Sequence, residues 1–402
     1  MNQQYGLHVE KDGTITLAGK PFYGFGVNLY TAFVHCYERP ETATYREQLA
    51  LMKFYNIPFV RMPLSGYLPN YYKDFDRDPE AMMDKMQLVL DEAERQQIGI
   101  IVSLMWWDPA VSGHMGEKRS AMGDPSSRTV DYARRYTALL VERFKHHKAV
   151  WGWEIGNEYN LTADMCDPKL QNHLWSDGIA SLPLSGVTAM DYYTTTELHN
   201  FYTEIAKEIR AHDTFRLISS GNGDMREFAF HLHQSAHRNP ITHLWTKDTT
   251  IDSLDQFYDM NAYLTPDPMD TVCFHLQHGS LNDTPPHYDY IVPRFGRSDV
   301  SHLEYFHEYK NAAKRLNKGL FFGECGDFMD MEAAPDIEEK FQMIIDWIVQ
   351  ADIQLAATWQ FSTDHGIDVN DKGIDGYKLH VLQEANKQYR MAGQQIIDKA
   401  WQ

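Results

Sequence analysis

Two glutamates lie at the ends of apolar segments that are far apart in the chain. Glu158 ends the segment that begins at Trp151, and Glu324 ends the segment that begins at Leu320. A carboxyl group held beside apolar and aromatic side chains has its charged form disfavoured, so the pKa of Glu158 should rise toward the value that a general acid needs near neutral pH. A single glutamate at the end of a strand is usually a structural hydrogen-bonding group. Two in matching positions are much harder to attribute to chance, and a protonated carboxyl group beside a charged one is suited to general acid/base and nucleophilic chemistry.

Eight short apolar runs alternate with amphipathic, helical patterns along the chain. Continuous apolar runs are typical of parallel strands that are covered on both faces. Eight of them alternating with helices predict a closed (β/α)₈ barrel. A doubly wound open sheet is the alternative, but no glycine-rich phosphate loop follows the first run. The runs are Tyr23–Leu29, Phe59–Pro63, Gly99–Leu104, Val150–Gly156, Phe215–Ser220, Thr271–His275, Leu320–Glu324 and Leu355–Phe361.

The sequence predicts a single domain in three parts: an N-terminal hairpin over 1–20, the barrel over 21–362, and a last loop with a C-terminal helix over 363–402. The hairpin is indicated by alternating residues around Asp12-Gly13, a pair that favours a tight turn. We expect it to close the bottom of the barrel. Three long connections, 161–196, 221–270 and 277–301, should follow strand ends at the face that carries the active site in barrel enzymes.

With these strands in place, the sequence resembles clan A of the glycoside hydrolases, and most of all family 5, the cellulase and β-mannanase family. Members place the acid/base glutamate after an asparagine on the fourth strand, as in Asn157-Glu158, and the nucleophile on the seventh, as at Glu324. The resemblance also implies roles in substrate binding or support of the nucleophile for residues on other strands. These are Arg61 on the second strand, His275 on the sixth and Trp359 on the eighth, where the reacting sugar would stack.

Arg61 has a further implication for charge. A nearby cation lowers the pKa of a carboxyl group, so we expect the pKa of Glu324 to shift down while that of Glu158 shifts up. Trp106 or Trp107 could offer a flat apolar face to sugar C–H groups. Asn157 could donate a hydrogen bond to a sugar hydroxyl.

The sequence departs from the family pattern at two places. Gln277 stands where the family commonly has a tyrosine that contacts the nucleophile, and Leu104–Asp108 has no histidine at the end of the third strand. Gln277 is therefore a candidate substrate-binding residue, and Tyr263, Tyr288 or Tyr290 could supply the missing hydroxyl. These differences concern the subfamily and the sugar rather than the two glutamates.

The net charge of the chain indicates which classes of binding partner to expect. A net charge of −19, from 37 basic and 56 acidic residues, disfavours nucleic acid and anionic lipid. We expect a β-linked oligo- or polysaccharide as the partner, and no cofactor. The histidines between His231 and His243 could suggest a metal site, but they fall in a predicted loop without a strand frame, so we expect no metal. Cys325 beside Glu324 is interpreted as a small packing residue.

The sequence as it stands lacks a basic and apolar leader or an apolar run of 18 residues. We therefore expect a cytoplasmic protein, or a secreted or periplasmic one if a signal peptide was removed. The predicted activity is retaining hydrolysis of β-linked glucosides or mannosides. A barrel that binds carbohydrate without catalysis, and a transglycosylase that uses the same two glutamates, are the alternatives.

Overall fold

The computed structural model describes residues 5–64, 69–164, 193–235, 237–238, 245–278, 293–327, 337–359, 376–390 and 400–401. Its centre is a closed barrel of eight parallel strands in the order β11-β12-β13-β4-β5-β6-β7-β8. The predicted fold class is therefore confirmed. The barrel strands are β4 (Gly24–Asn28), β5 (Phe59–Pro63), β6 (Gly99–Ser103), β7 (Val150–Glu154), β8 (Leu217–Ser219), β11 (Thr271–His278), β12 (Gly319–Asp327) and β13 (Leu355–Thr358).

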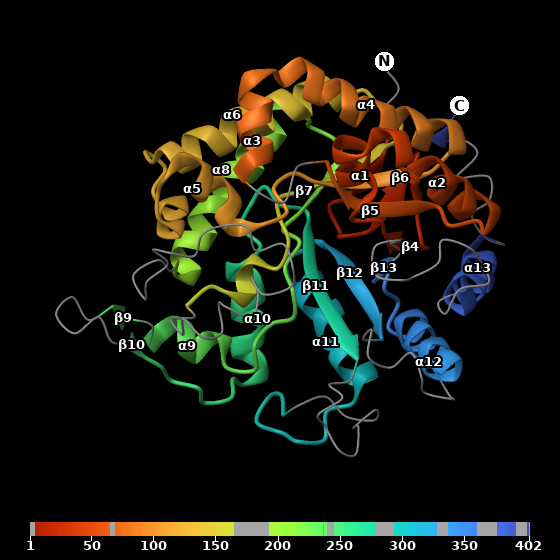
Figure 1. The fold of residues 1–402 in the computed structure, drawn as a ribbon. Coiled ribbons are helices and arrows are strands. Elements are labelled where there is room, and N and C mark those ends of the chain that lie inside the picture. The colour runs from red at the N-terminus through yellow and green to blue at the C-terminus, as the bar shows by residue number, and fades with distance from the viewer. Residues whose placement is uncertain are drawn as a thin grey trace.

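Helices surround the strands (Figure 1). They bury apolar stripes against the outside of the barrel, as the spacing predicts; Tyr45, Leu49 and Met52 of α2 are all buried. Thr194 and Ser253 are the N-cap residues of α8 and α10, and each forms a capping box with the third residue of its helix. The helices are α1 (Ala32–Glu38), α2 (Tyr45–Phe54), α3 (Pro69–Arg77), α4 (Pro79–Gln96), α5 (Asp108–Met115), α6 (Arg128–Phe144), α8 (Thr195–His212), α9 (Ala229–Ser235), α10 (Leu254–Tyr263), α11 (His302–Arg315), α12 (Ile337–Gln350) and α13 (Gly376–Arg390), with short 3₁₀ turns at Pro40–Thr42, Arg119–Gly123 and Tyr159–Leu161.

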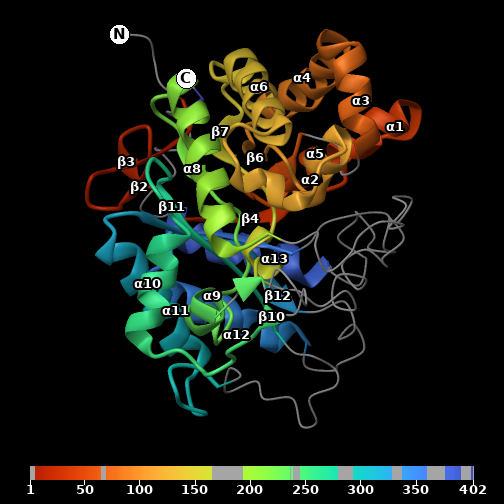
Figure 2. The same cartoon turned by 90° about the vertical axis from the view of Figure 1, so that its left-hand side faces the viewer.

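A small antiparallel sheet closes one end of the barrel (Figure 2). It has three strands rather than the two of the predicted hairpin: β1 (Leu7–Val9), β2 (Ile15–Leu17) and β3 (Lys20–Pro21). Leu7, Ile15 and Leu17 are buried in one cluster with side chains from the barrel interior, among them Trp151 and Phe321. Each such apolar side chain contributes roughly 1.5–3 kcal/mol by leaving water. The opposite end of the barrel, where the strands terminate, is left for the polar residues.

The connection over 221–270 differs from the predicted loop. It contains α9, α10 and a ribbon made of β9 (His237–Arg238) and β10 (Trp245–Thr246). His231 and His233 lie on α9, where His231 Nδ1 bonds Asp252 Oδ1 at 2.7 Å. These histidines are thus held by a helix. Within the described ranges, no helix combines the length and apolar character needed to cross a membrane.

Candidate active site

Polar residues gather at the level where the barrel strands end. Strand register places several of them directly beside one another on neighbouring strands, and hydrogen bonds and ion pairs join the rest into one polar cluster. The pairs are Asn28 with Arg61, Ser103 with Glu154, Glu154 with Ser219, and His275 with Glu324. The sequence-predicted Arg61, His275 and Glu324 are therefore brought together, and Glu158 joins them from the turn after β7.

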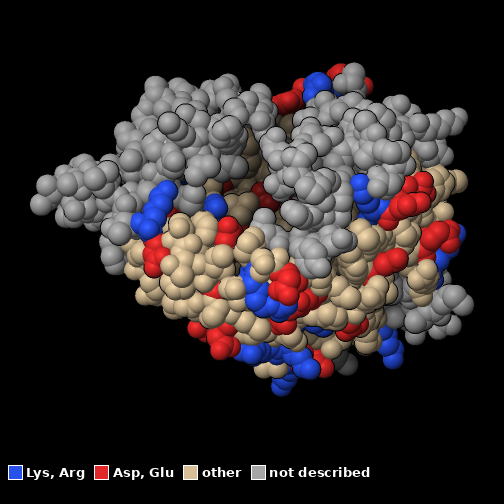
Figure 3. All heavy atoms as spheres, turned by 90° about the horizontal axis from the view of Figure 1, so that it is seen from below, with Lys and Arg blue, Asp and Glu red and all other residues tan. Residues whose placement is uncertain are grey.

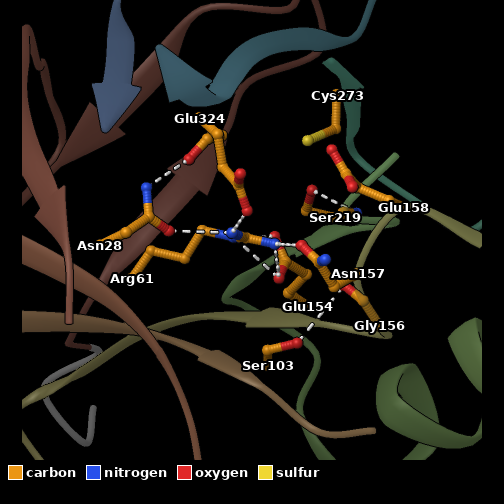
Figure 4. A network of polar contacts seen from close by, with 12 residues as sticks. Asn28, Arg61, Ser103, Glu154, Gly156, Asn157, Glu158, Ser219, Cys273 and Glu324 are labelled. Carbon is orange, nitrogen blue, oxygen red and sulfur yellow. Dashed lines mark hydrogen bonds and ion pairs between the residues drawn. The ribbon is translucent and has the colours of Figure 1, made fainter. Parts of the chain in front are cut away.

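Arg61 is the centre of this polar cluster (Figure 4). Its side chain is fully buried, and its guanidinium group donates to Glu324 Oε1 at 2.7 Å, Asn157 Oδ1 at 2.8 Å and Asn28 Oδ1 at 2.9 Å. Its Nε lies 2.9 Å from both carboxylate oxygens of Glu154. Glu154 and Glu324 raise the pKa of Arg61 further above its already high value, so the guanidinium stays charged. The Arg61 guanidinium thus holds both Glu324, the candidate nucleophile, and Asn157, the residue that precedes Glu158 in the sequence.

Glu154 and Asn28 were not identified from the sequence. Asn28 Nδ2 donates to the Gly323 carbonyl at 2.9 Å, and this contact holds the chain just before Glu324. A signal for Glu154 did exist: a charged residue inside an apolar strand must find a partner, since an unpaired buried charge is very costly. Arg61, in another apolar strand, was its natural counterpart. Sequence spacing alone does not show that the two strands lie close enough.

Glu158 occupies an unusual backbone position. Its φ of 56° and ψ of 28° fall in the left-handed region, which few residues other than glycine adopt. Its N–H donates to the Gly221 carbonyl at 2.7 Å, and the Asn157 N–H donates to the Trp106 carbonyl at 3.0 Å. These bonds from neighbouring strand ends hold the strained turn. Strain of this kind clusters at functional sites.

The Glu158 carboxyl group faces both the protein and solvent. Its side chain keeps 29% exposure, whereas the Glu324 side chain keeps 3%. Desolvation, with the charge of Asp224, raises the pKa of Glu158 to about 7, and Arg61 opposes this rise. Figure 3 shows a hollow on the face toward which the strand ends point, with acidic side chains visible at depth. The tryptophans of β7 do not surround Glu158, since Trp151 fills the bottom of the barrel and Trp153 donates to Asp213 at 2.9 Å.

The pKa of Glu324 differs from the expectation. Burial raises it above the usual range, and the neighbouring Glu158 adds to the rise. His275 and the Arg61 guanidinium act in the opposite direction without reversing it. The expectation that the two glutamates shift in opposite directions is therefore wrong. What distinguishes them is a direct ion pair: Glu324 Oε1 lies 2.7 Å from Arg61, whereas Arg61 acts on Glu158 as a neighbouring charge.

His275 lies between the two glutamates. Its Nδ1 is 3.1 Å from Glu158 Oε1 and 3.5 Å from Glu324 Oε1. Burial lowers the pKa of His275 to about 4, so the ring is neutral near neutral pH. One ligand atom from each of Glu158, His275 and Glu324 lies within 4.8 Å of the others. One carboxylate oxygen of Glu158 and one of Glu324 therefore lie close together in one site, and a close pair of carboxyl groups is typical of retention, whereas inversion leaves room for a water between them.

Three aromatic rings line the same end of the barrel. Trp359 follows β13, and its ring stacks on Tyr30 with centroids 5.2 Å apart. Tyr30 also stacks on Trp106 at 6.5 Å, and Trp106 covers the Arg61 guanidinium at 4.7 Å. Trp107 is the N-cap residue of α5 and is partly buried against the core, and its role in substrate binding stays a prediction. Trp106 contacts the Arg61 of the polar cluster, and Tyr30 is an addition that the sequence did not suggest.

The departures from the family pattern concern Gln277 and the tyrosine that would supply the missing hydroxyl group. Gln277 belongs to β11, but its side chain lies outside the described part, as do Tyr288 and Tyr290. Tyr263 does not supply the missing hydroxyl, because it ends α10, stacks on His199 at 4.4 Å and contacts Thr196 Oγ1 at 3.3 Å. Cys325 is buried with its Sγ 3.8 Å from Thr358 Oγ1, in agreement with a packing role.

One group of side chains has the spacing to hold a metal ion. Among the described residues, the one such group of histidine, cysteine or acidic side chains is Glu158, His275 and Glu324. Arg61, bonded to the same Glu324 oxygen, opposes a cation there.

Sequence comparison gives no relatives: no protein-family model matches the chain, and no curated protein matches it. Solved structures do match its fold. The endo-1,4-β-mannanase from Rhizomucor miehei aligns with a TM-score of 0.61 at 16% identity, over 95% of this chain and 99% of that one. The endo-β-1,4-mannanase from Thermotoga petrophila gives 0.60 at 14%, over 94% and 79%.

A family 5 mannosidase from Rhizomucor miehei aligns with a TM-score of 0.58 at 13% identity, over 99% of this chain and 100% of that one. The predicted resemblance to glycoside hydrolase family 5 is thus confirmed as a likeness of fold over nearly the whole chain. At such low identities the fold is all that these neighbours establish.

Proposed function

We propose that the chain is a retaining β-glycoside hydrolase with Glu158 as acid/base and Glu324 as nucleophile. The observation that carries the proposal is the placement of the two carboxyl groups beside a neutral histidine, with one oxygen of each within 4.8 Å of the other. Only one of them is paired with the buried arginine. A direct ion pair on one carboxylate, against a weaker influence of the same cation on the other, favours different protonation states for the two groups, as double displacement requires.

In the first step, the ionised Glu324 attacks the anomeric carbon while Glu158 gives its proton to the leaving oxygen. The leaving group departs as an alcohol, and a covalent glycosyl ester forms on Glu324. In the second step, Glu158 takes a proton from water, the water oxygen attacks the same carbon, and the Glu324 carboxylate is released. Asn157 is positioned for a sugar hydroxyl, because its oxygen is bonded to Arg61 and its amide nitrogen has no acceptor among the described residues.

The proposed substrates are β-linked mannosides, with β-glucosides as the second choice. The matching structures include proteins named endo-mannanases and a protein named mannosidase. Glucose and mannose differ in the orientation of one hydroxyl group, so both fit the same catalytic apparatus. Tyr30 and Trp359, whose stacked rings are both partly exposed, offer flat apolar faces of the kind that pack against sugar C–H groups.

A screen against aryl β-mannosides, aryl β-glucosides and defined β-1,4-oligosaccharides tests the function. We expect turnover with at least one β-mannoside, and the first product should have the β configuration when followed by NMR. Release of the α anomer would contradict the double-displacement assignment. Complete inactivity across the panel would favour a carbohydrate-binding barrel, and longer products at high acceptor concentration would identify transglycosylation.

The pH dependence of kcat/KM should be bell-shaped, with the alkaline limb near pH 7. Glu158 must carry a proton, and its pKa is raised to about 7, so activity should fall as pH rises above this value. Glu324 must be ionised, and its raised pKa places the acid limb above the ordinary glutamate value of 4.5. Glu158→Gln, assayed with a 2,4-dinitrophenyl glycoside that needs no acid to depart, should lose the alkaline limb. A limb that persists in this variant would belong to another group.

A further inference from the structure

Asp224 is a carboxylate that the mechanism above does not use. It follows β8 through residues 220–223, and three donors converge on it. Its Oδ1 accepts from the Tyr305 hydroxyl at 2.6 Å and from the Tyr309 hydroxyl at 2.8 Å, one helical turn apart on α11. Its Oδ2 accepts from the buried Arg294 at 2.6 Å. Such charge-assisted bonds are short and directional, so they hold the carboxylate in one place.

The backbone around Asp224 is locked to the turn that carries Glu158. Asn160, two residues after Glu158, donates to the Gly223 carbonyl at 3.0 Å and to the Asp224 carbonyl at 3.2 Å. The Gly223 N–H donates back to Asn160 Oδ1 at 2.8 Å. A side-chain carbon at Gly223 would lie 3.2 Å from Glu158 Oε1. The residue next to Asp224 therefore lies against the acid/base carboxyl group itself.

We propose that Asp224 is a positioning residue for the catalytic acid: its fixed negative charge, held by α11 and Arg294, keeps Glu158 protonated until the leaving group departs. This inference rests on the proposed function of Glu158. Within the described ranges, the charged and titratable groups that face Glu158 are Arg61 from β5, Asp224 after β8, His275 from β11 and Glu324 from β12. Arg61 favours loss of the proton, and His275 is neutral. Asp224 is the carboxylate that opposes Arg61 without taking part in the bond changes.

The same contacts would also suit a purely structural clamp between α11 and the loop after β8. The two roles differ in what they do to Glu158. A clamp contributes to stability and leaves the titration of Glu158 where it is. A fixed charge shifts that titration, because a like charge disfavours the ionised form of a neighbouring carboxyl group.

The test is Asp224→Asn in the full chain, with Glu158 followed directly by NMR of ¹³C-labelled glutamate and assigned with Glu158→Gln. We expect the Glu158 titration to move down by about one pH unit, and the alkaline limb of kcat/KM for a poor leaving group to move with it. A matched control is Glu227→Gln. Glu227 also accepts from Arg294, at 3.2 Å, but its side chain is more exposed, at 35%. This control should leave the titration unchanged.

An unchanged Glu158 titration in folded Asp224→Asn would overturn the proposal, and so would an equal shift in Glu227→Gln. If Asp224→Asn does not fold, Arg294→Gln tests the same interaction between Asp224 and Glu158, and the Glu158 titration should then move in the opposite direction. The tyrosine hydroxyls still hold Asp224 there, its countercharge is gone, and the titration should move up; no movement or a downward one would overturn the idea. The NMR titration needs no substrate, so its outcome is independent of the glycosidase activity. The substrate screen tests that activity separately.

Discussion

Glu324→Ala is expected to lower kcat by at least about 10⁴-fold, because the variant lacks the carboxylate that attacks the anomeric carbon. Its fold should persist, since Arg61 keeps its two bonds to Glu154 and its bonds to Asn28 and Asn157. The measurement is turnover of an aryl β-glycoside at saturating substrate, together with thermal unfolding. Wild-type-like turnover would remove Glu324 from the mechanism.

Sodium azide distinguishes the two glutamates. In Glu324→Ala, azide can attack from the side that the carboxylate has vacated, so the product should be a glycosyl azide of inverted configuration. In Glu158→Ala, Glu324 still forms the covalent ester, and azide should open it from the other face to give the β-glycosyl azide. Glu158→Ala should also lose most rate with poor leaving groups and little with 2,4-dinitrophenol, because only the former need a proton. The opposite pattern of products would mean that the roles are exchanged.

Arg61→Met is the second change with a large expected effect, and it should act on both stability and pH dependence. Removing one partner of a buried ion pair costs about 3–5 kcal/mol of unfolding free energy, because the other charge is left uncompensated. Here Glu154 and Glu324 both lose their cation. The acid limb of kcat/KM should move up by about 1–3 pH units, since the nearby positive charge no longer favours ionised Glu324. Denaturant unfolding and a pH–rate profile measure the two effects.

Arg216→Met provides the matched control. Arg216 is also buried and pairs with Asp213 at 3.0 Å, but it lies just before β8, at the end of the barrel away from the glutamates. This variant should lose a comparable amount of stability while its acid limb stays in place. If Arg61→Met lowered stability without moving the limb, Arg61 would have only a structural role.

The sequence alone determined the strand order and the residues at the strand ends. Apolar runs and helical stripes are local patterns, and each of the eight predicted runs overlaps a barrel strand. In a closed parallel barrel all strands end at one face, so the sequence predicts a common site for Glu158 and Glu324, and the family resemblance adds Arg61 and His275 to it. The tight turn at Asp12-Gly13 likewise predicted the small sheet that covers the other end.

The tertiary structure decided which of these side chains touch and what charge each carries. The pairing of Arg61 with Glu154 joins two strands separated by β6, and the anchoring of Asp224 joins the loop after β8 to α11. Such contacts depend on strand register and barrel closure, which no local pattern encodes. The rise in the pKa of Glu324 has the same origin: proximity to a cation could be inferred from the sequence, but the opposing cost of burying the carboxylate is set only when the folded chain excludes water from it.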